Sequence, residues 1–276
     1  ATHTVMSGPA VAVYSAWTGH LWPSLRPIAD QAIEILPHHI PTNDDVVVTA
    51  HAPEPVTPPQ SIRDRIDRIP SGDTHIRIER FHDDGGNRFE VYLSGTNFQG
   101  GESDPWNVAS NLDLATSGSS PSLQAVRIAM ESAGITRATP VVLSGHSQGG
   151  LIALAIAESR EFDVDAVITV GTPVGVVPDV TDIPTIHIVH PEDPIPAIGG
   201  LIDTESSTWI VPVENGERLF DAHHRQSYLS SSTALDDVAD ARITALRDAI
   251  QSNGVGVARD YRAVTTSARR QGTGAE

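Results

Sequence analysis

Hydrophobic and polar positions come in blocks along the second half of the chain, and the blocks have the lengths of strands and helices. Val141-Val142-Leu143 is a short β-branched and aliphatic run, which is typical of a buried parallel strand. The stretch from Leu151 to Ala157 is apolar at every position and rich in alanine, which favours a buried helix. From about residue 120 the order becomes helix, strand, helix, strand, strand, helix. This alternation predicts an α/β fold with a mostly parallel central sheet and helices on both faces.

The two ends of the chain have weaker patterns. Residues 1–60 are rich in proline and only partly helical in pattern, so we expect an irregular N-terminal extension. Apolar residues on both sides of Asp83-Asp84-Gly85-Gly86-Asn87 predict a hairpin that leads into a central strand. Gly, Ser, Thr and Arg dominate residues 253–276, and we expect a flexible tail there. The main α/β domain is therefore predicted to span residues 61–252.

Composition and charge narrow the classes of partner. With Lys+Arg 18 against Asp+Glu 35, the 276-residue chain has a formal net charge of −17, which argues against nucleic acid and anionic lipid as electrostatic partners. The absence of cysteine excludes disulfides, thiolate catalysis and sulfur-ligated metals. No apolar run approaches the roughly 20 residues of a membrane helix, so we expect no transmembrane segment. The sequence does not indicate an oligomeric state.

The chain starts with alanine instead of methionine. Either a leader has been removed or the chain is part of a longer protein, and we favour a secreted or cell-envelope location over the cytoplasm.

Gly145-His146-Ser147-Gln148-Gly149 lies between the predicted buried strand and the predicted buried helix. A G-x-S-x-G pentapeptide at such a junction predicts a nucleophile elbow, a tight turn that presents the serine hydroxyl. The two glycines would remove side chains that collide with the neighbouring strand and helix. The start of the following helix also points free N–H groups at the site, which suits a developing oxyanion.

A serine hydroxyl needs a base to accept its proton and a carboxylate to orient that base. In proteins with this elbow the acid and then the histidine follow the serine along the chain. The alternating run that ends at Val189 predicts a strand, and Asp193 lies just beyond its carboxyl end, so we expect Asp193 to be the acid. Glu192 and Asp182 are weaker candidates, because Glu192 should point away and Asp182 precedes the strand.

The adjacent His223 and His224 are the candidates for the base, because no other histidine follows the predicted acid. The sequence barely separates the two. We prefer His223 and keep His224 as the alternative. His187 and His190 lie three residues apart on a predicted strand and would face opposite ways, so we interpret both as structural instead of as a metal pair.

An oxyanion hole needs the N–H that follows the nucleophile, here that of Gln148, and a second N–H from the loop after an earlier strand. The predicted strand that ends in Ser94-Gly95-Thr96 supplies such a loop, so we nominate Thr96, whose hydroxyl can also fix the loop. A turn in which Thr96 caps a helix is the alternative.

Five motifs together resemble those of the class 3 lipases of the α/β hydrolase superfamily. That family has an oxyanion loop, a Trp and an Asn after it, the serine elbow, a Gly-Ser-Pro-like strand end and an Asp before a Pro, in this order. The matching residues here are Val91-Tyr92-Leu93-Ser94-Gly95-Thr96, Asp104-Pro105-Trp106-Asn107 with Asn111-Leu112, Ser144-Gly145-His146-Ser147-Gln148-Gly149-Gly150, Val170-Gly171-Thr172-Pro173 with Gly175, and Asp193-Pro194-Ile195-Pro196. The resemblance covers roughly residues 75–230.

The resemblance implies an α/β hydrolase fold with a catalytic domain over residues 61–252. It also implies that Ser147 is the nucleophile, Asp193 the acid and His223 or His224 the base, with Thr96 and Gln148 as oxyanion donors. The family's histidine is usually followed closely by an aromatic residue, matched here by Tyr228 at a looser spacing, and the family commonly has Arg where this chain has Ser94.

We therefore expect a serine hydrolase that cleaves a small-molecule or lipid ester without a metal or organic cofactor. An acyltransferase and a non-catalytic binding protein on the same scaffold are the alternatives. The segment from Asn97 to Ser120 could form a lid or an acyl-binding wall, or an ordered loop packed on the sheet.

Overall fold

The structure is a computed structural model of the chain. It describes residues 4–5, 45–101, 103–174, 180, 182–190, 192–198, 208–214, 221–236 and 241–266. Most of the predicted N-terminal extension therefore lies outside the described residues. Residues 45–50 and 54–56 are strands that pair with residues 255–266 in the main sheet, so the expected start of the α/β domain at residue 61 is wrong.

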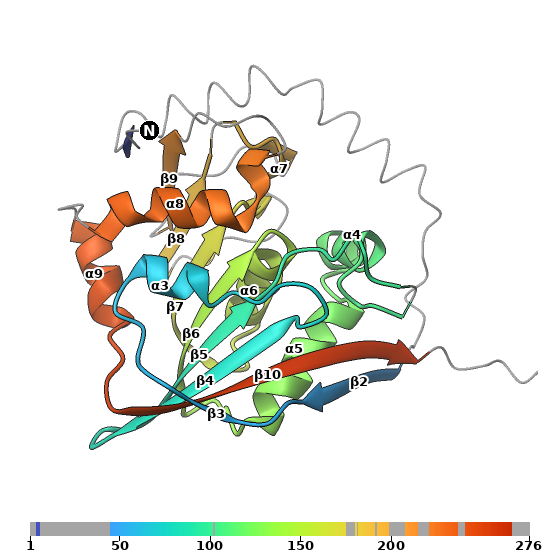
Figure 1. The fold of residues 1–276 in the computed structure, drawn as a ribbon, viewed down its shortest axis with the longest axis horizontal. Helices are drawn as coiled ribbons and strands as arrows, with labels where there is room; N and C mark the ends of the chain where they lie inside the picture. Colours follow the sequence, from blue (N-terminus) through green and yellow to red (C-terminus); the bar gives the residue numbers. More distant parts are fainter. Residues whose placement is uncertain are drawn as a thin grey trace, which may run out of the picture.

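One sheet of ten strands runs through the described part of the chain, in the order β1-β9-β8-β7-β6-β5-β4-β10-β2, with β3 also paired to β10 (Figure 1). The strands from β5 to β9 are parallel to one another, and the remaining pairings are antiparallel. The strands are β1 (Thr4–Val5), β2 (Asp45–Ala50), β3 (Glu54–Val56), β4 (Ile76–Asp83), β5 (Gly86–Leu93), β6 (Pro140–His146), β7 (Asp163–Val170), β8 (Thr185–Val189), β9 (Thr208–Glu214) and β10 (Val255–Thr266).

Helices cover both faces of this sheet. They are α3 (Ile62–Asp67), α4 (Val108–Ser117), α5 (Pro121–Ser132), α6 (Gln148–Ser159), α7 (Ile195–Ile198), α8 (Arg225–Asp236) and α9 (Ala241–Ala249), with a short 3₁₀ helix, η2 (Asp221–His223). Val141 and Leu143 of β6 pack in one hydrophobic cluster with α4, α5 and α6, whereas Val142 packs in a second cluster with α3, α8 and α9. Successive strand residues point to opposite faces, so the two clusters lie on the two sides of the sheet. The predicted α/β class is confirmed, and the sheet is parallel in its centre and antiparallel at its sides.

The predicted strand–turn–helix unit around residue 147 is confirmed as β6 followed at once by α6. Because β5 to β8 are parallel, their carboxyl ends meet at one edge of the sheet. The segments that follow β5, β6 and β8 therefore lie next to one another, although they come from distant parts of the sequence.

The expectation of a flexible tail from residue 253 is wrong for residues 255–266, which form the twelve-residue strand β10 between β4 and β2 (Figure 1). Its inward side chains are mostly small, with Gly256, Ala258 and Ala263 buried beside Tyr261. A methyl group on Gly256 would overlap the ring of Phe81, so a small residue is needed there. Small inward residues give little hydrophobic alternation, which is why the pattern did not predict a strand.

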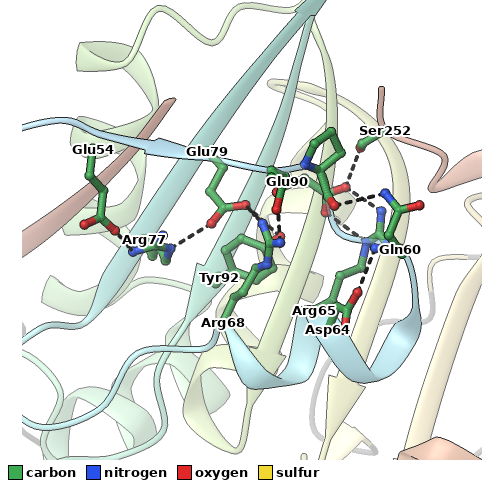
Figure 2. Close-up of polar contacts among 12 residues, drawn as sticks. Glu54, Gln60, Asp64, Arg65, Arg68, Arg77, Glu79, Glu90, Tyr92 and Ser252 are labelled. Carbon is green, nitrogen blue, oxygen red and sulfur yellow. Dashed lines mark hydrogen bonds and ion pairs between the residues drawn. The ribbon is translucent and has the colours of Figure 1, made fainter. Parts of the chain in front are cut away.

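Buried ion pairs join α3 to the face of the sheet (Figure 2). Glu79 of β4 and Glu90 of β5 are cross-strand neighbours, and both are fully buried. Arg65 binds Glu90 through two nitrogens at 2.6 and 3.1 Å, and Arg68 and Arg77 pair with Glu79. Two like charges that face each other inside a protein would be costly, so the three arginines are required to neutralise them.

Two neutral hydroxyls complete the cluster. Burial, and then the charges of Glu90 and Glu79, raise the pKa of Tyr92 well above its ordinary value. Its hydroxyl therefore stays protonated and donates to Glu79 at 3.3 Å. Ser252, which precedes β10, donates to Glu90 at 2.8 Å. The cluster thus connects α3, β4, β5 and the segment before β10.

Helix α3 in turn holds α8. Arg63 donates to the carbonyl of Leu229 at 2.6 Å. In the other direction, Arg225 at the start of α8 donates to the carbonyls of Ile66 and Asp67 at 3.2 and 3.1 Å. Charged hydrogen bonds to backbone carbonyls are stronger than neutral ones, so the two helices are fixed relative to each other. The buried cluster therefore fixes the position of α8 through α3.

Replacing Arg65 by methionine should destabilise the protein, because Glu90 would keep its charge in a buried site without its main partner. We expect Arg65→Met to lower the free energy of unfolding by about 3–5 kcal/mol in urea titrations. The double variant Arg65→Met/Glu90→Gln should lose less than the single variant, because the buried charge is gone. Arg80→Met, at an exposed arginine of β4, is the control. Equal losses in Arg65→Met and Arg80→Met would contradict this account.

Candidate active site

Ser147 lies between β6 and α6 with φ 50° and ψ −118°. A non-glycine residue in this region is strained by about 1–3 kcal/mol and persists only where its surroundings fix it. Here the Ser147 N–H donates to the carbonyl of Val170 at 2.9 Å, and the Thr172 hydroxyl donates to the Ser147 carbonyl at 3.3 Å. Contacts from the end of β7 thus hold the turn.

The tight turn also needs the two glycines of the pentapeptide. A methyl group on Gly145 would overlap the backbone of Gly149, and one on Gly149 would overlap the carbonyl of Leu93 in β5. Neither neighbour can move away easily, because both are backbone groups of α6 and the sheet. The glycines therefore allow the start of α6 to lie directly against β5 and β6.

The structure brings together Ser147, His223 and Asp193 from three separate segments. His223, at the end of η2, has its Nε2 3.1 Å from the Ser147 hydroxyl oxygen and its Nδ1 2.7 Å from Asp193 Oδ2. A carboxylate only accepts hydrogen bonds, so Nδ1 carries the proton and Nε2 is free to accept from the serine. Asp193, between β8 and α7, is 1% exposed, and its Oδ1 accepts the Ile195 N–H at 2.9 Å. These three residues were predicted to act together, and they form one hydrogen-bonded chain.

Tyr228 of α8 also holds Asp193, a role that the sequence analysis did not assign. The Tyr228 hydroxyl donates to Asp193 Oδ2 at 2.7 Å and accepts the His190 N–H at 3.2 Å. The ring of His190 is stacked on that of Tyr228, with centroids 3.8 Å apart, and its nitrogens lie 2.9 Å from the Ala222 carbonyl and 2.8 Å from the Ser231 hydroxyl. His190 is therefore structural, as predicted, and it fixes the position of Tyr228.

His146 is the other residue at the site that sequence reasoning missed. Its Nε2 lies 2.8 Å from the carbonyl oxygen of His223, so Nε2 carries the proton and donates. Burial, and then the proximity of His223, lower the pKa of His146 to about 3. The ring also lies close to Gly95, where a methyl group would be 2.7 Å from Nδ1. A neutral imidazole thus fills the space between the segment after β5 and the backbone of His223.

Thr96 and Gln148, the predicted oxyanion donors, lie next to each other. The Thr96 hydroxyl donates to the side-chain oxygen of Gln148 at 3.0 Å. Gln148 is the first residue of α6, so its backbone N–H has no partner within the helix. The N–H groups of Ser94 and Asn97 bond to carbonyls, but the N–H of Thr96 has no acceptor among the described residues. Both amides are therefore available beside Ser147.

Hydrogen bonds hold the described residues between Thr96 and α4. Trp106 is fully buried, its ring nitrogen donates to the Ser94 carbonyl at 3.1 Å, and it is stacked on His75. Asp104 accepts hydrogen bonds from His75, from the Trp106 N–H and from Asn97. Burial raises the pKa of Asp104, but these hydrogen bonds outweigh it and lower the pKa below its ordinary value. The charged carboxylate thus fixes the loop that carries Thr96.

The remaining candidates lie outside this arrangement. His224 is exposed, and Asp182 pairs with Arg160 at the surface. His187 is buried, with Nδ1 2.6 Å from the hydroxyl of Thr169. Within the described ranges, no group of three or more His, Asp or Glu side chains is arranged to hold a metal ion. No helix in the described part of the chain is both long and apolar enough to cross a membrane.

Comparisons with protein-family models, with curated proteins and with solved structures found no match to this chain.

The low pKa of His146 predicts a pH-dependent stability. An imidazole in the unfolded chain titrates near 6.5, so between about pH 6.5 and 3 the unfolded state binds more protons than the folded state. The contribution of neutral His146 to the free energy of unfolding is complete above pH 6.5. It is lost as the pH falls, by up to about 1.4 kcal/mol per pH unit. We expect His146→Gln, which keeps a donor for the His223 carbonyl, to show a shallower loss in urea titrations at pH 7, 6, 5 and 4. Parallel curves for the two proteins would contradict this assignment.

Proposed function

We propose that this protein is a serine hydrolase that cleaves carboxylic esters through an acyl-enzyme. The observation that carries the proposal is the hydrogen-bonded chain from Ser147 through His223 to Asp193, anchored on a strained turn. A serine hydroxyl is a poor nucleophile at neutral pH and needs a base within hydrogen-bond reach. A histidine that is itself oriented by a buried carboxylate meets this need.

In the first half of the proposed reaction, His223 Nε2 takes the proton from Ser147 as its oxygen attacks the ester carbonyl carbon. The carbonyl π electrons move onto its oxygen, and the N–H groups of Gln148 and Thr96 stabilise the resulting oxyanion. When the tetrahedral intermediate collapses, the bond to the alcohol oxygen breaks and protonated His223 gives that oxygen its proton. An alcohol leaves, and the acyl group stays on Ser147.

In the second half, water takes the place of the alcohol. His223 removes a proton from the water as it attacks the acyl carbon, and the same amides stabilise the second oxyanion. Collapse then breaks the bond to the Ser147 oxygen, which receives the proton from His223. Asp193 keeps the Nδ1–H tautomer throughout and stabilises the imidazolium that forms in each half.

The order of the motifs also supports this function. The resemblance to class 3 lipases supports an α/β hydrolase fold, and it makes small-molecule or lipid esters the substrates to test first. The central parallel strands, with the three residues beyond their carboxyl ends, agree with that interpretation.

Turnover of p-nitrophenyl esters with short, medium and long acyl chains tests the proposal. We expect turnover by the intact protein, its loss in Ser147→Ala, and a fluorophosphonate label located on Ser147 by mass spectrometry. The preferred chain length would separate an esterase from a lipase. Faster acyl transfer to an added alcohol than to water would identify an acyltransferase. The absence of both turnover and label would contradict the proposal and favour a non-catalytic binding protein.

The two adjacent histidines provide a matched pair of variants. His223→Ala should lose at least roughly a thousandfold in kcat/KM, because no base would reach the Ser147 hydroxyl. His224→Ala should keep the activity of the parent protein, because His224 is exposed. Comparable losses in both variants would contradict the assignment of His223 as the base.

Tyr228→Phe should lower kcat and leave KM unchanged, since it removes one donor to Asp193 and no contact to substrate. A hydrogen bond to a charged group is worth about 1.5–3 kcal/mol, of which we expect only part to appear in the rate, as a loss of about tenfold. Steady-state kinetics at several pH values would measure it. An unchanged kcat would show that the bonds from His223 and from the Ile195 N–H suffice to hold the carboxylate.

A further inference from the structure

Helix α6 begins with a glutamine whose side chain lies in a continuous hydrogen-bond chain that is buried except at Thr96. The Thr96 hydroxyl donates to Gln148 Oε1 at 3.0 Å, and Gln148 Nε2 donates to the hydroxyl oxygen of Ser122 in α5 at 3.2 Å. Ser122 lies 2.8 Å from the Ser110 hydroxyl and 3.0 Å from the Ser120 hydroxyl. The chain thus connects the loop after β5 to α4 and α5 through the first residue of α6.

We propose that the carboxamide of Gln148 is a positioning group that holds the Thr96 loop in place for oxyanion binding. This inference rests on the proposed function. The backbone amides of Thr96 and Gln148 are the two oxyanion donors of that function, and here their side chains are bonded to each other. A single hydrogen bond therefore sets the relative position of the two donors.

Burial of Gln148 and of the serines beyond it makes the loss of the Thr96–Gln148 hydrogen bond costly. Gln148 and Ser122 are fully buried, Ser110 is 2% exposed and Ser120 is 6% exposed. A buried polar group that loses its partner is costly, so Thr96 cannot move away without leaving Gln148 Oε1 unpaired. The amide is also bonded at its other end, where Nε2 donates to the Ser122 oxygen. Both ends of the Gln148 carboxamide are thus bonded, one to Thr96 and the other to α5.

The neighbouring bonds leave Thr96 dependent on this link. On one side the Ser94 N–H bonds to His75, and on the other the Asn97 N–H bonds to Trp106. Thr96 lies between these two fixed points and is half-buried. The Thr96 hydroxyl binds this residue to the first residue of α6. A displacement of about 1 Å at a group that stabilises a transition state is enough to lower the rate strongly.

The test compares Thr96→Val and Gln148→Met, each nearly isosteric, with Thr96→Ser, which keeps the hydroxyl. We expect Thr96→Val and Gln148→Met each to lower kcat for p-nitrophenyl esters by about tenfold with little change in KM. The double variant should lose no more than the worse single variant, because both remove the same bond. Thr96→Ser should keep most of the kcat of the parent protein. Thr116→Val, on α4, is the matched control, because its exposed hydroxyl bonds to the Leu112 carbonyl and to no other described residue.

Amide hydrogen exchange supplies a readout that needs no substrate. In peptides covering residues 94–107, Thr96→Val and Gln148→Met should exchange about fivefold faster than the parent protein, the change expected for one lost hydrogen bond of ordinary strength. Thr96→Ser and Thr116→Val should exchange like the parent.

The two readouts separate the two proposals. An active parent whose Thr96→Val and Gln148→Met variants keep kcat, or lose only global stability, overturns the positioning role. Additive losses in the double variant overturn it as well. A parent without turnover or label defeats the proposed function alone, and hydrogen exchange then decides whether Gln148 holds the Thr96 loop.

Discussion

Ser147 has a left-handed backbone, and a residue with a side chain keeps that conformation only where its neighbours leave it no alternative. Gly145 and Gly149 allow the close approach of α6 to β5 and β6, and bonds to Val170 and Thr172 fix the turn from the side of β7. The turn is thus held by three neighbouring strands and one helix. Its rigidity determines where the side chains on either side of Ser147 can reach.

Because the turn is so tight, three consecutive side chains contact two other parts of the protein, His223 and the loop of Thr96. His146 donates to the backbone of His223, Ser147 faces the ring of His223, and the Gln148 side chain accepts from Thr96. In the proposed reaction these two parts carry the base and one oxyanion donor, and the nucleophile lies between them on the turn. One short segment therefore contacts groups that lie far apart in the sequence and helps to set their spacing.

The sequence was sufficient to predict those parts of the molecule in which the hydrophobic pattern and the catalytic motif lie in the same segment. The apolar runs around the elbow predicted β6 and α6, and the order of acid and histidine along the chain predicted Asp193 and narrowed the base to His223 or His224. It was insufficient where side chains are small or where a role depends on distant partners. The small inward residues of β10 gave no alternation, and the roles of His146, Gln148 and Tyr228 arise from contacts that no local pattern specifies.

The supports of the site come from opposite faces of the sheet. On one face, the ion pairs of α3 fix α8, and α8 carries Tyr228 against the carboxylate of Asp193. On the other face, Ser122 of α5 bonds to Gln148, which in turn bonds to Thr96. The sheet lies between these two sets of contacts, and they come together at Ser147 and the residues beside it. In the proposed reaction, a change within one set should therefore act first on either the acid–base side or the oxyanion side of the site. His146, which lies between Gly95 and the carbonyl of His223, is a contact between the two sides.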